Sequence, residues 1–291
     1  MSPQDHYRGL HVVVTGANGF LGRALVKRLE GLGCRVTGLG RSTGFRLLED
    51  ELPLEGVDHV FHLAAETGVP DSWEDPVRFH LVNAHGTVRV LDQCRRSRSS
   101  LTYVGAYIYG APRELPIGEL HPIDPNNPYA FSKWMGEQAC AWYADVFRMN
   151  VSAIRLFNVY GPGQSNRFLI PRIVEQALEP GDADIELMDL SPRRDYLYVD
   201  DAVDALLHAM PRETFRIYNV GHGVSHSVSE VVDVVLRRTG SRKRVRAVGQ
   251  PRTNEIQDVV ADTALLRQES GWAPRVSLED GIQRVIEGFQ S

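Results

Sequence analysis

The sequence predicts an α/β fold built on a parallel β-sheet, and patterns in the first 65 residues indicate this class. An apolar strand at residues 11–15 runs straight into a turn with glycines three residues apart, and a helical pattern follows at once. Further strand patterns come at 35–39 and 57–65. A strand, helix and strand of this size form a βαβ unit, in which the two strands are parallel.

The glycine turn after the first strand has the features of a phosphate site. Gly16 supplies the sharp turn, Gly19 lets a pyrophosphate approach the backbone, and Gly22 lets the helix lie close to the strand. A helix that begins near residue 20 leaves its first N–H groups unpaired, and they favour an anion. The alternative is a glycine-rich connection that binds nothing. We expect dinucleotide contacts from Gly16, Asn18, Gly19, Phe20, Leu21 and Gly22.

The bulk composition excludes several classes of protein. A chain of 291 residues can bury a large core, and its net charge of −5 argues against a nucleic-acid partner. The three cysteines are odd in number and far apart, so we expect reduced thiols and neither a disulfide framework nor a metal site. No leader-like segment opens the chain and no apolar run reaches membrane-spanning length. We therefore expect a cytoplasmic protein without a membrane partner.

The residues after the second strand bear on the choice of cofactor. The first helical pattern ends at Gly31 and Gly33, and the second strand is followed by Gly40-Arg41-Ser42. An acidic side chain there would bind the adenosine ribose and repel a 2′-phosphate. Since Arg41 and Ser42 suit a phosphate, NADP is favoured over NAD, although Arg41 could be an ordinary solvated loop residue.

The third strand, 57–65, ends in small or apolar residues, where backbone can approach a ligand closely. We expect Leu63, Ala64 and Ala65 to contact the cofactor. Helical spacing then runs from about 73 to 98, and Asn83 interrupts it with a polar group. Asn83 is either a cofactor contact or a satisfied core amide.

A long loop follows the fourth strand, which we place at 101–105. Five prolines between 112 and 128 mark it as irregular, and a loop of this length in an α/β protein is more often functional than idle. It lies beyond the carboxyl end of a strand, where open α/β sheets bind their ligands.

Tyr129 and Lys133 open the next helix and are four residues apart, so they project from the same face. A phenol with a pKa near 10 is a poor base at neutral pH. An ammonium about 4 Å away is worth about 4 kcal/mol to the phenolate at an effective dielectric of ~20. That equals a fall of roughly three units in the phenol pKa. The pair could therefore supply a proton acceptor; the alternative is a cation that only lies near a ring.

Ten motifs in this order resemble the extended short-chain dehydrogenases/reductases, especially the nucleotide-sugar epimerases and dehydratases. The resemblance covers nearly the whole chain. The motifs are Thr15–Gly22, His62–Ala65, Asn83 with Gly86-Thr87, Tyr109-Gly110, Tyr129 with Lys133, Arg155–Gln164, Arg194–Asp201, Tyr218–Gly221, Pro251-Arg252 with Ala261-Asp262, and Gly271-Trp272.

The resemblance implies a doubly wound, Rossmann-like parallel sheet and a smaller, mostly C-terminal α/β lobe that holds a nucleotide-diphosphate sugar. The dinucleotide domain would comprise 1–158 and about 195–222, and the lobe about 159–194 and 223–291. Members of the family are commonly homodimers through a four-helix bundle, here formed by helices near 74–98 and 129–148.

By position, three residues resemble the family's ligands for the substrate diphosphate. Asn158 corresponds to the residue that contacts the pyrophosphate, and Arg194 and Arg252 correspond to its phosphate-binding arginines. The alternative for Arg194 is a structural ion pair with Asp195 or Asp201.

One departure from the family concerns the catalytic Ser or Thr, whose position is taken by Gly105. Dehydratase-like members also carry an acidic pair at the next two positions, and here these are Ala106 and Tyr107. Elimination of water needs a general acid and base near the leaving group, so 4,6-dehydration is disfavoured. Tyr107 could be a second proton donor or could only fill volume beside the sugar.

These observations favour an enzyme that oxidises a nucleotide-linked sugar, at C4, by hydride transfer to nicotinamide, with epimerisation as the net reaction. In this scheme Tyr129 takes the hydroxyl proton, and Lys133 lowers its pKa and holds the nicotinamide ribose. An NADPH-dependent keto-sugar reductase is the first alternative. Because Gly105 replaces the catalytic hydroxyl, a dinucleotide-binding sensor or scaffold without turnover is the second.

Overall fold

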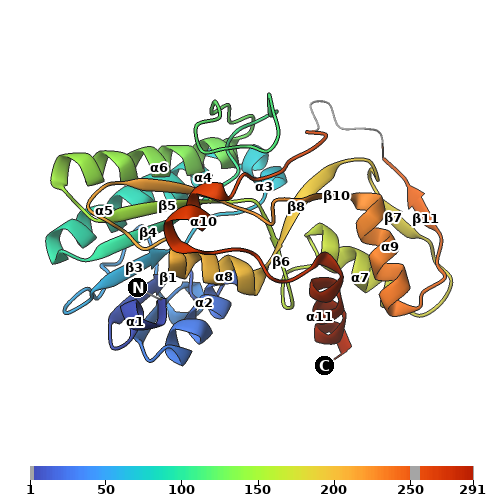
Figure 1. The fold of residues 1–291 in the computed structure, drawn as a ribbon, viewed down its shortest axis with the longest axis horizontal. Helices are drawn as coiled ribbons and strands as arrows, with labels where there is room; N and C mark the ends of the chain where they lie inside the picture. The colour runs from blue at the N-terminus through green and yellow to red at the C-terminus, as the bar shows by residue number, and fades with distance from the viewer. Residues whose placement is uncertain (1–2, 250–255, 291) are drawn as a thin grey trace.

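The computed structural model describes residues 3–249 and 256–290, and its centre is a six-stranded parallel sheet (Figure 1). The spatial order is β2-β1-β3-β4-β5-β9. Within the sheet, the chain runs from β1 to β2 on one side and then crosses to β3 on the other side of β1. In open α/β sheets, ligands bind at the carboxyl ends of the strands where the strand order reverses in this way, here β1 and β3. The strands are β1 (His11–Thr15), β2 (Arg35–Leu39), β3 (His59–His62), β4 (Ser100–Ala106), β5 (Val151–Leu156) and β9 (Arg216–Val220).

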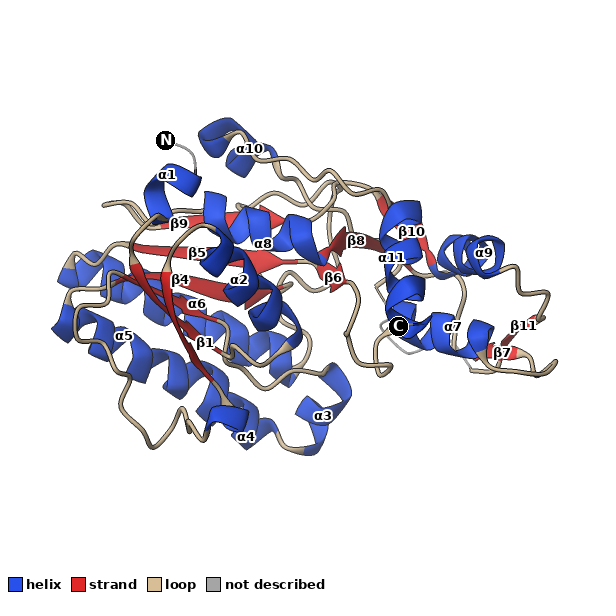
Figure 2. Cartoon of the chain, turned by 90° about the horizontal axis from the view of Figure 1, so that it is seen from below, coloured by secondary structure: helices blue, strands red, loops and turns tan. Residues whose placement is uncertain are grey.

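Helices cover both faces of this sheet (Figure 2). On one face α2 (Phe20–Gly31) packs against α8 (Val199–His208), and on the other α5 (Gly86–Ser97) packs against α6 (Pro128–Phe147). The predicted doubly wound parallel sheet is therefore confirmed.

A smaller part of the molecule, at the right of Figure 1, has its own hydrophobic cluster. Its helices α7, α9 and α11 contact one another, and two small sheets complete it, in the orders β10-β8-β6 and β11-β7. Its elements are β6 (Asn158–Tyr160), α7 (Leu169–Leu178), β7 (Ile185–Leu187), β8 (Arg193–Tyr198), β10 (Ser225–Ser227), α9 (Val228–Thr239), β11 (Val245–Ala247) and α11 (Leu278–Gln290).

The remaining elements are short. Those between residues 69 and 85 interrupt the helical pattern expected from about 73 to 98. Asp75 caps a new helix that has Pro76 in its first turn, and a π-helical turn precedes α5. These elements are α1 (Pro3–Tyr7), η1 (Arg41–Thr43), α3 (Val69–Glu74), α4 (Pro76–His80), η2 (Leu81–His85) and α10 (Ala264–Ser270).

Local sequence also sets the start of α6. The Asn127 side chain accepts the N–H of Ala130 at 2.8 Å, and Pro128 occupies the first turn, where its missing N–H is not needed. Tyr129 is thereby fixed in the first turn of a 20-residue helix. Among the described residues, none of the helices is both long and apolar enough to span a membrane.

Candidate active site

The glycine turn lies at the carboxyl end of β1 and leaves no room for side chains. Gly16 has a φ of +72°, and a Cβ there would lie 2.8 Å from the backbone nitrogen of Ala64. A Cβ on Gly22 would lie 2.1 Å from the Gly16 carbonyl oxygen. Helix α2 begins at Phe20, and its N-cap, Gly19, has no side chain to pair the first N–H groups. This bare cradle fits the diphosphate of a dinucleotide.

The backbone directly after β3 lies beside this turn. Strand β3 covers His59–His62, a shorter span than the predicted 57–65. Leu63 donates its N–H to the Thr15 carbonyl at 3.2 Å, and Ala64 donates to the Thr15 hydroxyl at 3.2 Å. Residues 63–65 thus form one wall of the crevice at the carboxyl ends of β1 and β3.

The loop after β2 lies next to the glycine turn. Asn18 packs against it, because a Cβ on Gly40 would lie 2.3 Å from the Asn18 amide oxygen. Arg41 is 82% exposed, and its guanidinium lies 3.4 Å from a carboxylate oxygen of Glu66. The same oxygen accepts from Arg78 at 2.8 Å. Sequence reasoning missed Glu66, and its place directly after Ala65 was the available signal.

Asn83 links the end of β3 to α6. It is 1% exposed, and its amide oxygen accepts the Glu66 N–H at 2.8 Å. Its amide nitrogen donates to the Glu66 carbonyl at 3.0 Å and to the Ser132 hydroxyl at 2.9 Å. Ser132 in turn donates to the Tyr129 carbonyl at 2.8 Å. The structure thus has the satisfied core amide that we gave as an alternative, and a cofactor contact by Asn83 stays a prediction.

Tyr129 and Lys133 lie in the first two turns of α6, as predicted, but their electrostatics differ from expectation. Lys133 is 3% exposed, and its Nζ lies 4.5 Å from the ring centroid of Tyr103. Burial lowers the pKa of Lys133 to about 8 and raises the pKa of Tyr129 to about 12. The expected lowering of the Tyr129 pKa is therefore wrong for this geometry, since burial of the phenol dominates.

Gly105 lies opposite Arg155 in the β4–β5 ladder. A Cβ at this position would lie 2.9 Å from the Ile154 carbonyl oxygen, so a serine would force β4 and β5 apart. Two residues on, Tyr107 is partly buried and donates its hydroxyl to the Gly110 carbonyl at 2.6 Å. Burial raises the pKa of Tyr107, and the nearby charge of Arg194 opposes this shift.

A buried charge network holds α6 to the sheet, and sequence reasoning did not identify it. Arg155 in β5 donates to both carboxylate oxygens of Glu137 in α6, at 2.8 and 2.6 Å, and these side chains are 4% and 2% exposed. Arg155 also donates to the Tyr109 hydroxyl at 2.6 Å, which donates to Asn219 at 2.6 Å. A charged residue in the mostly apolar strand Val151–Leu156 was the available signal.

Two of the three predicted substrate residues, Asn158 and Arg194, lie in the neighbouring strands β6 and β8. Asn158 pairs with Tyr196 in this small sheet, and its amide nitrogen lies 3.5 Å from the Asp195 carbonyl. Arg194 donates to the carbonyls of Arg193 and Ile256 at 2.8 and 2.7 Å, and its charge acts on Tyr107. Arg252 lies outside the described residues.

The carboxylates considered as partners of Arg194 accept backbone N–H groups. Asp195 accepts from His222, Gly223 and Ala261 at 2.5, 2.9 and 3.0 Å. Asp201 accepts from two residues before α11, at 3.0 and 2.9 Å. Within 3–249 and 256–290, no group of three or more His, Cys, Asp or Glu side chains could hold a metal ion.

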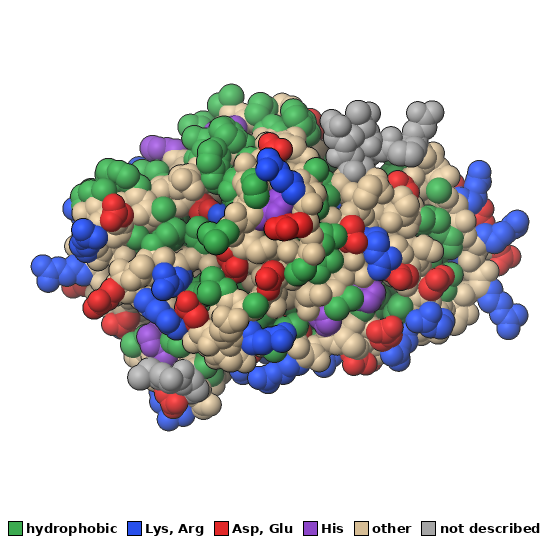
Figure 3. Space-filling model, turned by 45° about the horizontal axis from the view of Figure 1, so that its top comes forward, with side chains coloured by type: hydrophobic (Ala, Val, Ile, Leu, Met, Phe, Trp, Pro, Cys, Tyr) green, Lys and Arg blue, Asp and Glu red, His purple; other side chains and the backbone are tan. Residues whose placement is uncertain are grey.

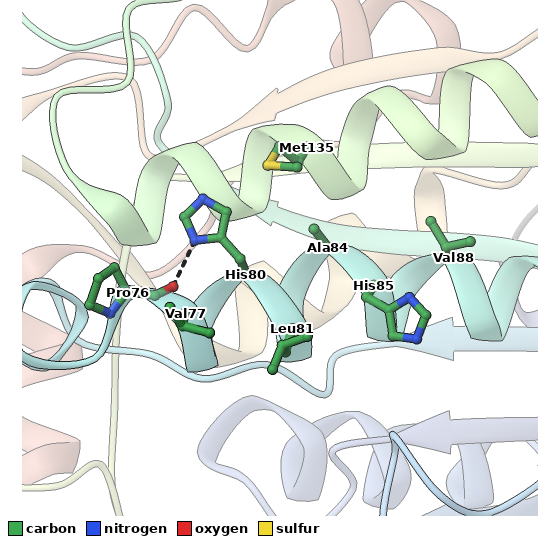
Figure 4. Close-up of a pocket in the computed structure, with 8 residues that line it drawn as sticks. All are labelled: Pro76, Val77, His80, Leu81, Ala84, His85, Val88 and Met135. Carbon is green, nitrogen blue, oxygen red and sulfur yellow. Dashed lines mark hydrogen bonds between the residues drawn. The ribbon is translucent and has the colours of Figure 1, made fainter.

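Away from the crevice, an apolar hollow of about 580 Å³ lies on the outer face of α4, η2 and α5 (Figure 4). Met135 of α6 completes it, and the His80 side chain bonds to the Pro76 carbonyl beneath it at 2.7 Å. Exposed apolar side chains surround the hollow, including Val77 at 66% and Leu81 at 47%.

Comparison with known proteins agrees with this geometry. The NAD dependent epimerase/dehydratase family matches residues 12–221. A UDP-glucose 4-epimerase of Mycolicibacterium smegmatis is 32% identical, over 97% of this chain and 99% of its own. Among solved structures, MoeE5 in complex with UDP-glucuronic acid and NAD is 28% identical, with a TM-score of 0.86 over 96% of this chain and 99% of its own.

A second solved structure resembles the chain equally well. RMD from Pseudomonas aeruginosa, complexed with NADPH, is 26% identical, with a TM-score of 0.88 over 97% of this chain and 99% of its own. The family match covers the glycine turn, the wall at the end of β3 and both Tyr129 and Lys133. The family match includes most of the chain, and the relative from M. smegmatis aligns over 97% of this chain and 99% of its own length. The chain therefore belongs to the NAD-dependent epimerase/dehydratase family of nucleotide-sugar enzymes.

Proposed function

We propose that this enzyme epimerises a nucleotide-diphosphate sugar at C4, using a bound nicotinamide dinucleotide. The carrying observation is the placement of Tyr129 and Lys133 one turn apart at the start of one helix, in the same fold as the bare glycine cradle. The relative from M. smegmatis, a UDP-glucose 4-epimerase, and MoeE5 with UDP-glucuronic acid and NAD support the reaction and the substrate class.

When bound, the dinucleotide would supply the hydride acceptor for oxidation of the sugar carbon and the hydride donor for its reduction on the opposite face. The backbone N–H groups at the start of α2 would hold its diphosphate. The Lys133 ammonium would bind the nicotinamide ribose, and its charge would oppose the rise that burial causes in the Tyr129 pKa. Tyr129 would take the proton of the sugar hydroxyl and give it back after the hydride returns.

Further residues would serve the sugar nucleotide. Asn158, Arg194 and Arg252 would bind its diphosphate, a role that suits a planar guanidinium. Tyr107 would be the second proton donor, and its closeness to Arg194 supports a place beside the sugar. We also keep Asn83 as a contact of the cofactor.

NADP is the cofactor that we favour. Arg41 is exposed at the carboxyl end of β2, beside Ser42, and the position that would repel a 2′-phosphate carries no carboxylate. The NADPH complex of RMD supports this choice, and the NAD complex of MoeE5 opposes it. Titration of the apoenzyme with both dinucleotides tests it: Arg41→Ala should weaken NADP binding and leave NAD binding unchanged.

The proposed mechanism is tested with wild type and Tyr129→Phe on a panel of UDP-, GDP- and dTDP-sugars. Epimerisation by wild type without net NADPH consumption, and its loss in the variant, is the expected result. Equal rates in both proteins would reject the tyrosine mechanism.

The same arrangement, including Arg41, also fits a reductase, the second candidate. NADPH absorbance would then fall in proportion to product when a keto-sugar is supplied. The close approach of Gly105 to β5 is the observation behind a third reading, a dinucleotide-binding sensor or scaffold. Dinucleotide binding without turnover of any panel member would favour it.

We also propose a homodimer formed through α4, η2, α5 and α6. Exposed apolar side chains lie on these helices, including Val77, Leu81 and Trp142, which is 54% exposed. Figure 3 shows hydrophobic side chains gathered along the upper edge of one face. In sedimentation, Leu81→Glu should convert a dimer to a monomer. Val224→Glu, at a 51% exposed site outside these helices, should leave the mass unchanged.

We propose a dinucleotide domain of 1–158 and about 195–222, and a sugar-nucleotide lobe of about 159–194 and 223–291. Two hydrophobic clusters support this proposal, because most residues of each cluster come from one of these parts. The clusters also cross the boundaries: Leu266 and Trp272 pack in the first, and Tyr196 and Tyr198 in the second. The three cysteines are free thiols, which supports the proposal of a reducing, cytoplasmic compartment.

A further inference from the structure

Tyr103, in the middle of β4, contacts Lys133 at two points. Its hydroxyl donates to the backbone carbonyl of Lys133 at 2.9 Å. Its ring faces the other end of the same residue, with the Nζ atom 4.5 Å from the ring centroid. Tyr103 is 0% exposed, so both contacts lie in the dry interior between sheet and helix.

One glycine provides space that this tyrosine occupies. A Cβ on Gly136, one turn after Lys133 in α6, would lie 2.7 Å from the Tyr103 hydroxyl oxygen and 2.9 Å from the Asn83 carbonyl oxygen. A side chain at position 136 would therefore displace Tyr103 from Lys133.

The other charged or titratable groups around Lys133 only partly oppose the lowering of its pKa by burial. Burial and the charge of Lys133 lower the pKa of His62, in β3, to about 3, so its ring is neutral. Glu137, in α6, uses both carboxylate oxygens on Arg155. Burial raises the pKa of the Cys140 thiol, which is therefore neutral as well. Direct contact with an aromatic face is a known way to stabilise a desolvated ammonium.

We propose that Tyr103 is a positioning residue for Lys133: its ring face holds the ammonium in place, and its hydroxyl holds the backbone of the helix that also carries Tyr129. The proposal rests on the proposed function, since it assigns Lys133 to the reaction. It also accounts for the glycine at position 136, because a side chain there would collide with the Tyr103 hydroxyl.

The test changes the electron density of the ring and keeps its shape. Position 103 is replaced with phenylalanine, 4-fluorophenylalanine and pentafluorophenylalanine in the full chain, because fluorination weakens the attraction of the ring face for a cation. The ammonium is titrated by carbon-13 NMR of labelled lysine side chains. The chain has only three lysines, Lys27, Lys133 and Lys243, so the signals are few, and Lys133→Met identifies one.

We expect the Lys133 pKa to fall by about one unit from the phenylalanine to the pentafluorophenylalanine protein, a tenfold change in proton affinity. In the active enzyme the pH profile of kcat should shift in the same order, and KM should stay unchanged. Pentafluorophenylalanine at Phe61, an equally buried ring in β3 that packs against Tyr7 and His59, should change neither quantity.

Equal Lys133 titrations across the series would overturn the proposal and leave Tyr103 with a space-filling role. The NMR titration needs no turnover. If wild type converts no nucleotide sugar, the proposed function fails, and the lysine titration still decides whether the ring holds the ammonium.

Discussion

Replacing Lys133 with methionine should abolish catalysis and stabilise the fold. The lysine is 3% exposed, and burial lowers its pKa from 10.5 to about 8. At about 1.4 kcal/mol per pH unit, keeping this ammonium protonated in the folded protein costs about 3 kcal/mol at neutral pH. Methionine has a similar length and no charge, so Lys133→Met should recover about 2–3 kcal/mol.

The pH dependence of this gain in stability follows from the lowering of the Lys133 pKa in the folded protein. Between pH 8 and 10.5 the unfolded chain holds a proton that the folded chain has released, so the unfolding free energy of wild type rises with pH. The advantage of Lys133→Met should therefore be largest below pH 8 and should shrink to about 1–1.5 kcal/mol near pH 9.5.

Equilibrium unfolding in urea at about pH 7 and about pH 9.5 measures both quantities, and tryptophan fluorescence reports the transition. Lys27→Met, on the exposed face of α2, is the matched control and should change stability by less than about 0.5 kcal/mol at either pH. The reasoning is refuted if Lys133→Met is no more stable than wild type at neutral pH, or if its advantage does not depend on pH.

Three further outcomes follow from packing and charge. Glu137→Gln should cost about 3–5 kcal/mol in urea unfolding, because Arg155 keeps an uncompensated buried charge, and the double variant Glu137→Leu/Arg155→Met should recover part of that loss. Gly22→Ala should abolish dinucleotide binding in a titration, whereas Gly31→Ala, whose Cβ meets no described atom within 4 Å, should retain it and gain about 0.5–1 kcal/mol. Glu66→Gln should strengthen NADP binding roughly two- to fivefold by freeing Arg41, since an exposed ion pair is worth at most about 1 kcal/mol, and unchanged binding would show that Arg41 does not meet the 2′-phosphate.

The parallel sheet and the glycine turn were predictable because each rests on local chemistry. The start of α2 at Phe20 and the span of β2 followed from glycine spacing and apolar runs, and the structure has both. The tyrosine and lysine of α6 were predictable as a pair because the helix period places them on one face.

The electrostatics of that pair were not predictable from spacing. The Tyr129 pKa depends on burial, and the Lys133 ammonium faces Tyr103, which comes from a strand 30 residues earlier in the chain. The Arg155–Glu137 pair joins positions 18 residues apart in the same way. Such contacts depend on how sheet and helix meet, which no short window of sequence records.

The amide of Asn83 makes two separate segments behave as one piece. It hydrogen-bonds both backbone groups of Glu66 and the hydroxyl of Ser132. These bonds connect the segment after β3, beside the glycine turn, to the helix that bears Tyr129. In the proposed mechanism, this link would keep the cofactor cradle and Tyr129 in one fixed arrangement whichever sugar is bound. Differences in sugar size would then be accommodated by the proline-rich loop after β4 and by the smaller lobe, without a change in the proposed chemistry.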